Sequence, residues 1–307
     1  MGHIHRSTVA RLPKGLLVLS LLLAFAQVRG DEQLTMSGVM AAAGPADWRQ
    51  PEAANTLYMQ LPQGLVVFEL APQFAPATIA NIRVLVEQQF FDGLAIVRSQ
   101  DNYVVQWGDP NAGTADARAQ GDAADTLAPE FFLSRDGVNM TLLDSRDAYA
   151  EEVGFAGGLP AARDAGRAWL AHCYGMLGVG RAEGIASGNG AELYVVTGHA
   201  PRHLDRNVTL IGRVLHGMEH LSTLPRGSGP LGYYEHESEH VEIRTLRFGD
   251  QLEVADRLPL QVLRTDTDTF RDLVDARTNR LEHWFADPAG KIELCNVPLP
   301  VRLATPD

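Results

Sequence analysis

The sequence FFDGLAIVRSQDNYVVQWGDP, residues 90–110, contains two β-prone runs separated by a short polar turn. The first run ends at Arg98, and the second begins at Tyr103 and contains Gln106. Successive side chains alternate between the two faces of a strand. Pairing of the two runs would therefore place a cation, an aromatic ring and an amide near one surface, which makes this stretch the candidate functional site.

The segments on either side of this stretch predict a mainly β fold with few helices. Apolar runs at 57–61 and 65–70 surround a Pro-Gln-Gly turn, which is typical of a β-hairpin. Pro76 begins a helical stretch, because proline is tolerated in the first turn and apolar residues then follow at helical spacing. Further predicted elements are strands at 176–179, 193–197, 208–211 and 241–248 and a short helix at 217–224.

The composition is that of an acidic globular protein. The 307 residues are 45% hydrophobic and 21% charged, with a formal net charge of -12. A strongly acidic chain repels phosphate, so nucleic-acid partners are not expected. Two cysteines exclude a disulfide-dense scaffold and a four-cysteine zinc site.

The N-terminus is typical of a cleavable secretory signal peptide. Arg6, Arg11 and Lys14 precede an apolar run at 16–26, which is too short to remain as a membrane-spanning helix. We expect cleavage after Ala26, with no stable membrane insertion afterwards and a periplasmic location. An uncleaved anchor or a buried helix is the alternative.

An oxidising compartment would allow Cys173 and Cys295 to form a disulfide. Two buried free thiols are the alternative, and the sequence does not show whether the two cysteines lie close enough to bond.

Two terminal segments lack the strand pattern of the centre. Residues 27–56 are rich in Ala, Gly and Pro and are interpreted as an extended leader. Residues 249–307 contain an amphipathic stretch at 267–277 and a proline-punctuated tail. This C-terminal annex is small enough that we expect it to pack on the main domain, residues 57–248.

The central segments together resemble the cyclophilin family of peptidyl-prolyl cis/trans isomerases. The family's FxDGxxxxR segment, followed by an aromatic residue, Gln and GDP, is similar to residues 91–110. Later segments, GMLGVGR at 175–181, LYVVT at 193–197, HLD at 203–205 and IGRV at 211–214, resemble family motifs in the same order.

The resemblance implies an eight-stranded antiparallel barrel capped by two helices, which isomerises X–Pro bonds of proline-containing polypeptides, among them exported client proteins, without a cofactor. It implies that Arg98 and Gln106 are catalytic. It also implies a substrate groove formed by Tyr103, Val104, Glu192, Tyr194, His203 and Leu204. The chemistry agrees, because a fixed cation can stabilise the amide as it twists and loses resonance, with no proton transfer or covalent step.

Several positions depart from the family pattern. His203 replaces an aromatic residue at the pocket rim, Glu192 replaces a glutamine, and Val208 lies where many members have a histidine. Residues 111–172 are longer than the corresponding family segment, which indicates an insertion near the groove. These changes leave open a second hypothesis, a barrel that binds proline segments without useful turnover.

The run His236-Glu237-Ser238-Glu239-His240 satisfies the H-E-x-x-H pattern of zinc proteases. That chemistry needs both histidines on one face of a helix. Here the run leads into a predicted strand, so a polar loop is the preferred interpretation and no metal site is predicted.

Overall fold

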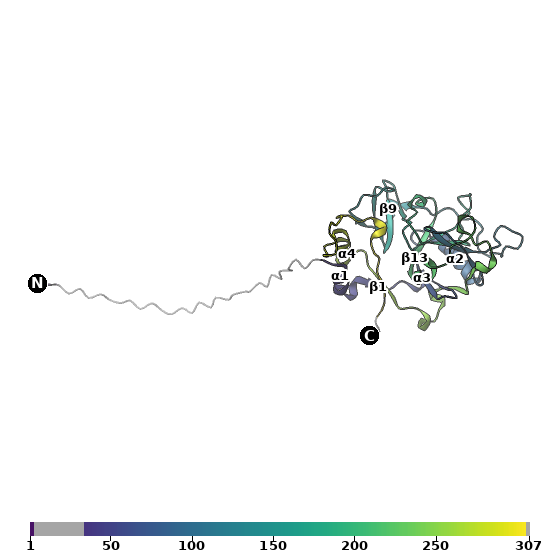
Figure 1. Ribbon diagram of the computed structural model, residues 1–307, viewed down its shortest axis with the longest axis horizontal. Helices are drawn as coiled ribbons and strands as arrows, with labels where there is room; N and C mark the ends of the chain where they lie inside the picture. The colour runs from purple at the N-terminus through teal and green to yellow at the C-terminus, as the bar shows by residue number, and fades with distance from the viewer. Residues whose placement is uncertain (3–33, 305–307) are drawn as a thin grey trace. The chain divides into compact units, whose positions relative to one another are not determined.

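The two β-prone runs of the candidate site form an antiparallel pair, β4 (Ala95–Ser99) and β5 (Val104–Gly108). The pairing places Arg98 directly opposite Gln106, and the register shifts between Ile96 and Arg98. Figure 1 shows the computed structural model, which describes residues 1–2 and 34–304. The predicted signal peptide lies outside these residues except for Met1 and Gly2.

These two strands belong to a nine-stranded antiparallel sheet with the order β14-β4-β5-β12-β11-β13-β3-β2-β15. The other members are β2 (Thr56–Gln60), β3 (Leu65–Leu70), β11 (Met176–Val179), β12 (Leu193–Val196), β13 (Leu210–His216), β14 (Val241–Glu242) and β15 (Thr245–Phe248).

The sheet curls because its two edge strands are consecutive in the chain. β14 pairs with β4 at one edge and β15 pairs with β2 at the other. Between them, the Ile243 carbonyl accepts the Gly93 N–H at 2.7 Å, and the Arg244 N–H donates to the Gln60 carbonyl at 2.9 Å. The single strand predicted at 241–248 is thus two strands, β14 and β15, which lie at the two edges of the sheet and bring those edges together. The structure confirms the expected antiparallel barrel-like fold, although its sheet has nine strands and not the predicted eight.

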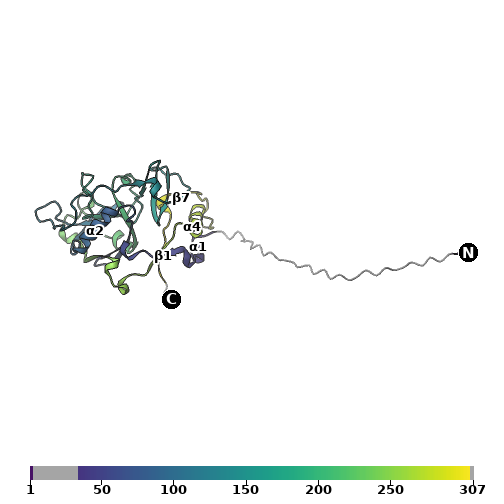
Figure 2. The same ribbon diagram turned by 180° about the vertical axis from the view of Figure 1, so that it is seen from behind.

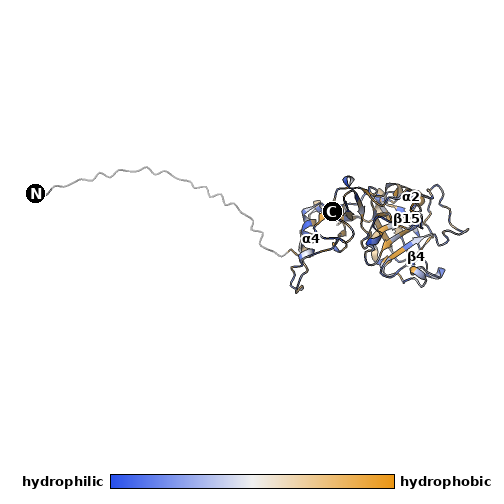
Figure 3. Ribbon diagram, turned by 90° about the horizontal axis from the view of Figure 1, so that it is seen from above, coloured by the Kyte–Doolittle hydropathy of each residue, from blue (hydrophilic) through white to orange (hydrophobic). Residues whose placement is uncertain are grey.

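Two helices complete the barrel core, α2 (Pro76–Glu87) and α3 (Met218–Ser222). The apolar positions predicted at helical spacing on α2 are buried, and Leu221 of α3 lies in the same cluster. Figure 3 shows hydrophobic residues along the strands near the labels α2, β15 and β4. Proline at the first position of α2 supplies the helical φ and removes an N–H that would lack a partner.

Much of the described chain outside the barrel packs around a second hydrophobic cluster, to which barrel residues such as Val104 and Tyr194 also contribute. A five-stranded sheet has the order β6-β10-β9-β8-β7, and a three-stranded sheet the order β1-β16-β17. Their strands are β1 (Trp48–Arg49), β6 (Leu133–Ser134), β7 (Thr141–Leu143), β8 (Glu152–Ala156), β9 (Leu159–Arg163), β10 (Arg167–Leu170), β16 (Leu260–Leu263) and β17 (Val301–Leu303). The helices are α1 (Met36–Ala42) and α4 (Asp268–Asn279), which lie side by side in Figure 2.

The expectation of an extended leader is wrong for its described part, residues 34–56. The Thr35 side chain caps α1 by accepting the Gly38 N–H at 3.1 Å, and Val39 is buried against the second cluster. β1 then pairs with β16 of the C-terminal annex, with Trp48 opposite Leu263. Leader, insertion and annex therefore share one core.

A disulfide joins Cys173, just before β11, to Cys295 in the annex, with a Cα–Cα distance of 5.0 Å. Among the described residues, no helix has the length and hydropathy needed to cross a bilayer.

Candidate functional site

The Arg98 guanidinium is held from three sides. Its Nη1 donates to Gln106 Oε1 at 3.0 Å, its Nε donates to the Leu231 carbonyl at 2.8 Å, and its Nη2 donates to Gln100 Oε1. The aromatic rings of Tyr103 and Tyr233 lie 5.6 and 5.2 Å from the Arg98 Cζ. A guanidinium has five N–H donors, so two remain for a ligand after these three bonds.

Gln106 is oriented by its second partner. Its Nε2 donates to Glu192 Oε2 at 2.8 Å, so its Oε1 must be the atom that faces Arg98. Gln106 is buried on β5 and lies opposite Tyr194 of β12. The three side chains thus form a row in which a carboxylate fixes the amide and the amide fixes the cation.

This row lies along a groove of about 660 Å³. Its walls contain most of the predicted substrate-binding residues together with others from β11, the following loop and the 230–234 loop. The lining residues are Arg98, Tyr103, Val104, Gln106, Val179, Gly180, Arg181, Ala182, Glu183, Glu192, Tyr194, Leu204, Val208 and Tyr233. His203 is absent from this lining. It stacks on Tyr103, with ring centroids 6.4 Å apart and an angle of 6° between the planes.

Tyr194 forms part of the groove but is only 5% exposed. Its hydroxyl lies 2.8 Å from His172 Nε2, away from the solvent. Gly178 on β11 faces the ring, and a Cβ at that position would come within 2.3 Å of Tyr194 Cζ. Glycine at 178 therefore provides the room that a tyrosine needs at 194.

A buried polar network continues from Tyr194. His172 Nδ1 lies 2.8 Å from Asp205 Oδ1, and Asp205 Oδ2 accepts bonds from Arg202 Nε at 2.6 Å and Trp169 Nε1 at 3.2 Å. Arg202 also contacts both carboxylate oxygens of Asp147, at 2.9 and 3.1 Å. Every polar side chain of this network has a partner, which is the condition for placing such groups in a core.

Burial sets the charge states of this network. Burial lowers the pKa of His172 below its usual range, although Asp205 opposes the shift, so the imidazole is neutral. Burial alone would raise the pKa of Asp205, but hydrogen bonds from His172 and the charge of Arg202 outweigh it and lower that pKa. Burial raises the pKa of Tyr194, so the phenol keeps its proton.

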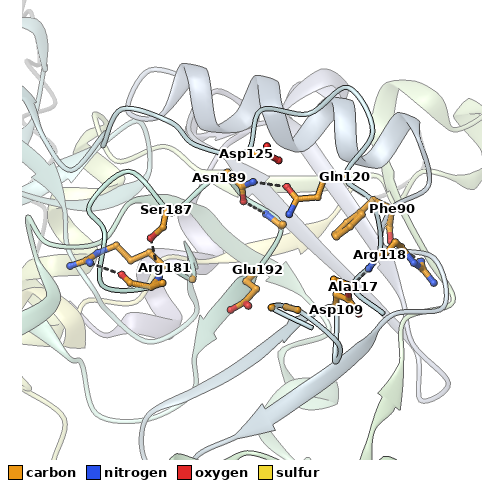
Figure 4. Close-up of a pocket in the computed structure, with 15 residues that line it drawn as sticks. Phe90, Asp109, Ala117, Arg118, Gln120, Asp125, Arg181, Ser187, Asn189 and Glu192 are labelled. Atoms are coloured by element: carbon orange, nitrogen blue, oxygen red, sulfur yellow. Dashed lines mark hydrogen bonds between the residues drawn. The ribbon is translucent and has the colours of Figure 1, made fainter. Parts of the chain in front are cut away.

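A second, smaller cavity of about 220 Å³ adjoins the groove and shares Gly180, Arg181, Ala182 and Glu192 with it (Figure 4). Its walls include Asp109, Asp125 and Arg118. Asn189 spans one side, where its Nδ2 donates to Gln120 Oε1 at 2.6 Å (Figure 4).

The H-E-x-x-H run does not form the helix that a zinc protease needs. Residues Glu237–Glu239 form one turn of 3₁₀-helix that leads into β14. Glu239 caps this turn by accepting the His236 N–H at 2.9 Å. Within residues 34–304, no group of three or more His, Cys, Asp and Glu side chains is arranged to hold a metal ion.

The structure therefore brings seven of the eight predicted site residues to one groove and leaves His203 beside it. Sequence reasoning missed His172, Asp205 and Tyr233. Tyr233 lies in a Gly232-Tyr233-Tyr234 run that precedes the H-E-x-x-H stretch, and an isolated antiparallel bridge pairs it with Arg98. His172 has no local signal, because its partners come from distant segments.

Comparisons with known proteins agree with this arrangement. Residues 56–247 match the family model described as cyclophilin type peptidyl-prolyl cis-trans isomerase/CLD. A probable peptidyl-prolyl cis-trans isomerase of Brucella suis biovar 1 (strain 1330) is 27% identical over 191 residues, which cover 62% of this chain and 79% of that protein. Human peptidyl-prolyl cis-trans isomerase-like 1 is 29% identical over 101 residues, which cover 32% and 58% of the two chains.

Among solved structures, cyclophilin AquaCyp293 from Hirschia baltica superposes with a TM-score of 0.66 at 24% sequence identity. The superposition covers 89% of this chain and 99% of that one. The shared fold thus extends beyond residues 56–247 into the second cluster.

Proposed function

Because the chain belongs to the cyclophilin-type peptidyl-prolyl cis-trans isomerase family, we propose that it catalyses rotation about X–Pro bonds of exported polypeptides. The observation that carries this proposal is the Arg98 guanidinium, fixed by Gln106 at 3.0 Å on the wall of an open, partly apolar groove.

The reaction requires binding and electrostatics only. Amide resonance opposes rotation with a barrier of about 18–20 kcal/mol. As the bond twists, the prolyl nitrogen becomes pyramidal, and its lone pair, which was delocalised into the carbonyl, becomes localised on the nitrogen. The two N–H groups of Arg98 without protein partners are available to donate to the substrate, and arginine stays protonated throughout.

Preorganisation explains the role of the Gln106–Glu192 pair. Without Glu192, the Gln106 amide could rotate and present its NH2 group toward the cation. The 2.8 Å bond to the carboxylate excludes that orientation, so Arg98 is already in place when the peptide binds. A donor that needs no reorganisation is worth more in the transition state than a mobile one.

The apolar part of the groove is suited to a proline ring. Val104, Tyr194, Leu204 and Val208 supply aliphatic and aromatic surface next to the cation. Binding the ring there would fix one side of the X–Pro bond while the other side rotates.

Residues 27–307 purified without the predicted signal peptide test this proposal in a proline-peptide assay. Exchange between cis and trans forms, followed by NMR, should be faster with enzyme than without it. Exchange at the uncatalysed rate, with the peptide bound, would contradict the proposal. That result would favour the second candidate, a proline-binding module, which is motivated by the displacement of His203 from the groove lining.

We also propose that the protein acts in the periplasm. The proposal is supported by the basic and apolar N-terminal sequence and by the Cys173–Cys295 disulfide, since disulfides persist in oxidising compartments. N-terminal sequencing of the protein from its native host should begin at Gln27. A cytoplasmic fraction that retains Met1 would contradict it.

A further inference from the structure

The proton positions around His172 follow from its partners. Asp205 Oδ1 lies 3.0 Å from the His172 backbone nitrogen and 2.8 Å from Nδ1. The carboxylate can only accept, so Nδ1 carries the imidazole proton. Nε2 then has a free lone pair, and the hydrogen bond at 2.8 Å must be donated by the Tyr194 hydroxyl. The hydroxyl is thereby directed into the protein and away from the groove.

The anchor of this pair lies in the insertion. His172, Trp169 and Asp147 all belong to residues 111–172, whereas Asp205 and Arg202 follow β12 of the barrel. Asp205 is hydrogen-bonded to Trp169 and His172 of the insertion, and Arg202 is hydrogen-bonded to Asp147 of the insertion. His172 has no exposed surface, so its ring has no freedom to leave this position.

We propose that His172 is a positioning residue for the proline pocket. By accepting a hydrogen bond from the Tyr194 hydroxyl, it keeps that hydroxyl out of the groove, so that Tyr194 presents only its apolar ring to the substrate. This inference rests on the proposed function, because it assigns the pocket to proline. It gives the insertion a role in substrate binding without a residue of its own in the groove lining.

The alternative state of Tyr194 gives the consequence of losing His172. A phenol in a core without an acceptor leaves its O–H unpaired. Tyr194 lines the groove, where water could accept that hydrogen bond. The ring would tilt toward that water and place a polar group where the proline ring binds. We expect proline-peptide affinity to fall about tenfold, equal to about 1.4 kcal/mol.

Four variants of residues 27–307 test the inference by titration with a proline peptide. His172→Leu keeps bulk but removes the acceptor, and should bind about tenfold more weakly. His172→Gln, whose amide oxygen can replace Nε2, should bind within about threefold of wild type. The double variant His172→Leu/Tyr194→Phe should recover affinity, since it has no hydroxyl to place. His216→Leu, a half-buried histidine on β13 outside the network, is the control.

The recovery is what a merely structural role would not produce. Equal affinity of His172→Leu and wild type would overturn the inference, and so would a double variant as weak as the single one. If His172→Leu does not fold, ¹⁵N NMR of wild type decides: Nε2 of His172 unprotonated and bonded to a slowly exchanging Tyr194 hydroxyl supports the inference, and a protonated Nε2 overturns it.

The titration separates this inference from the proposed function. Wild type that binds the peptide without accelerating its isomerisation refutes the proposed activity, and the affinities of the variants still judge His172. Wild type that does not bind the peptide overturns the role of His172 together with the assignment of the pocket.

Discussion

Removing the Cys173–Cys295 disulfide should destabilise the protein strongly, because the bond closes a loop with a sequence separation of 122. The chain-entropy relation gives about 5 kcal/mol for a loop of this length at 25 °C. Removing a native disulfide typically lowers the free energy of unfolding by about 2–5 kcal/mol. Cys173 is buried and Cys295 packs against the second cluster, so the alanine variants also lose the packing contacts of the two sulfur atoms. We therefore expect a loss of about 3–5 kcal/mol for Cys173→Ala/Cys295→Ala.

Guanidinium unfolding followed by fluorescence measures this loss. With a slope of about 5 kcal/mol per molar denaturant, the midpoint should fall by roughly 0.6–1 M. Wild type treated with a reductant should show the same midpoint as the double variant, and the reductant should leave the double variant unchanged. A midpoint shift below about 0.2 M would refute the reasoning, because it would mean that the loop is already closed in the unfolded chain.

Three further outcomes follow from the site. The pKa values of His172 and Asp205 are lower in the folded protein than in the unfolded chain, so the unfolded chain takes up protons first as the pH falls. Stability should therefore fall below pH 6.5, the ordinary histidine pKa, and fall further below 3.8, the ordinary aspartate pKa. A melting temperature that is flat from pH 7 to 4 would contradict this. Gly178→Ala should weaken proline-peptide binding more than tenfold, because its Cβ would lie 2.3 Å from Tyr194 Cζ; unchanged affinity in titration calorimetry would contradict it. Glu192→Gln should raise kcat/KM for an acidic proline peptide about two- to fivefold relative to a neutral one, and less in high salt; an equal change for both peptides would show that the charge does not reach the substrate.

The barrel could be predicted because its strands and turns have local signals. The Pro62-Gln63-Gly64 turn joins β2 and β3 as expected, and the two runs around Arg98 and Gln106 pair, which brings these side chains to one surface as predicted. Pairing of adjacent strands needs only short-range pattern, which a single sequence contains.

The second cluster could not be predicted because its pairings are long-range and its strands are weakly marked. Trp48 pairs with Leu263, and no local pattern relates the two. Ala161, Ala162 and Ala168 fill the centre of the five-stranded sheet, although alanine is depleted in strands. The Ala-rich leader forms α1 because α4 covers it, which is a tertiary effect.

The residues that line the groove could be predicted from the sequence, whereas the buried residues that hold them in place could not. Tyr194 was identified from a strand motif, but the histidine beneath it comes from the insertion and the aspartate beneath that from a loop after β12. His203 was expected at the rim, and the structure stacks it on Tyr103 outside the groove lining. Both features depend on where separate segments meet, and periodicity gives no information on that.

The most direct test of the central claim is to measure both kcat/KM for isomerisation and affinity for the proline peptide in Arg98→Ala and Arg98→Lys. If the fixed guanidinium stabilises the twisted amide, Arg98→Ala should lose about 100-fold or more in kcat/KM while binding the proline peptide within about threefold of wild type. Arg98→Lys should recover little, because an ammonium cannot reproduce the forked bonds to Gln106 and Gln100. Arg98→Ala with wild-type kcat/KM would contradict the claim.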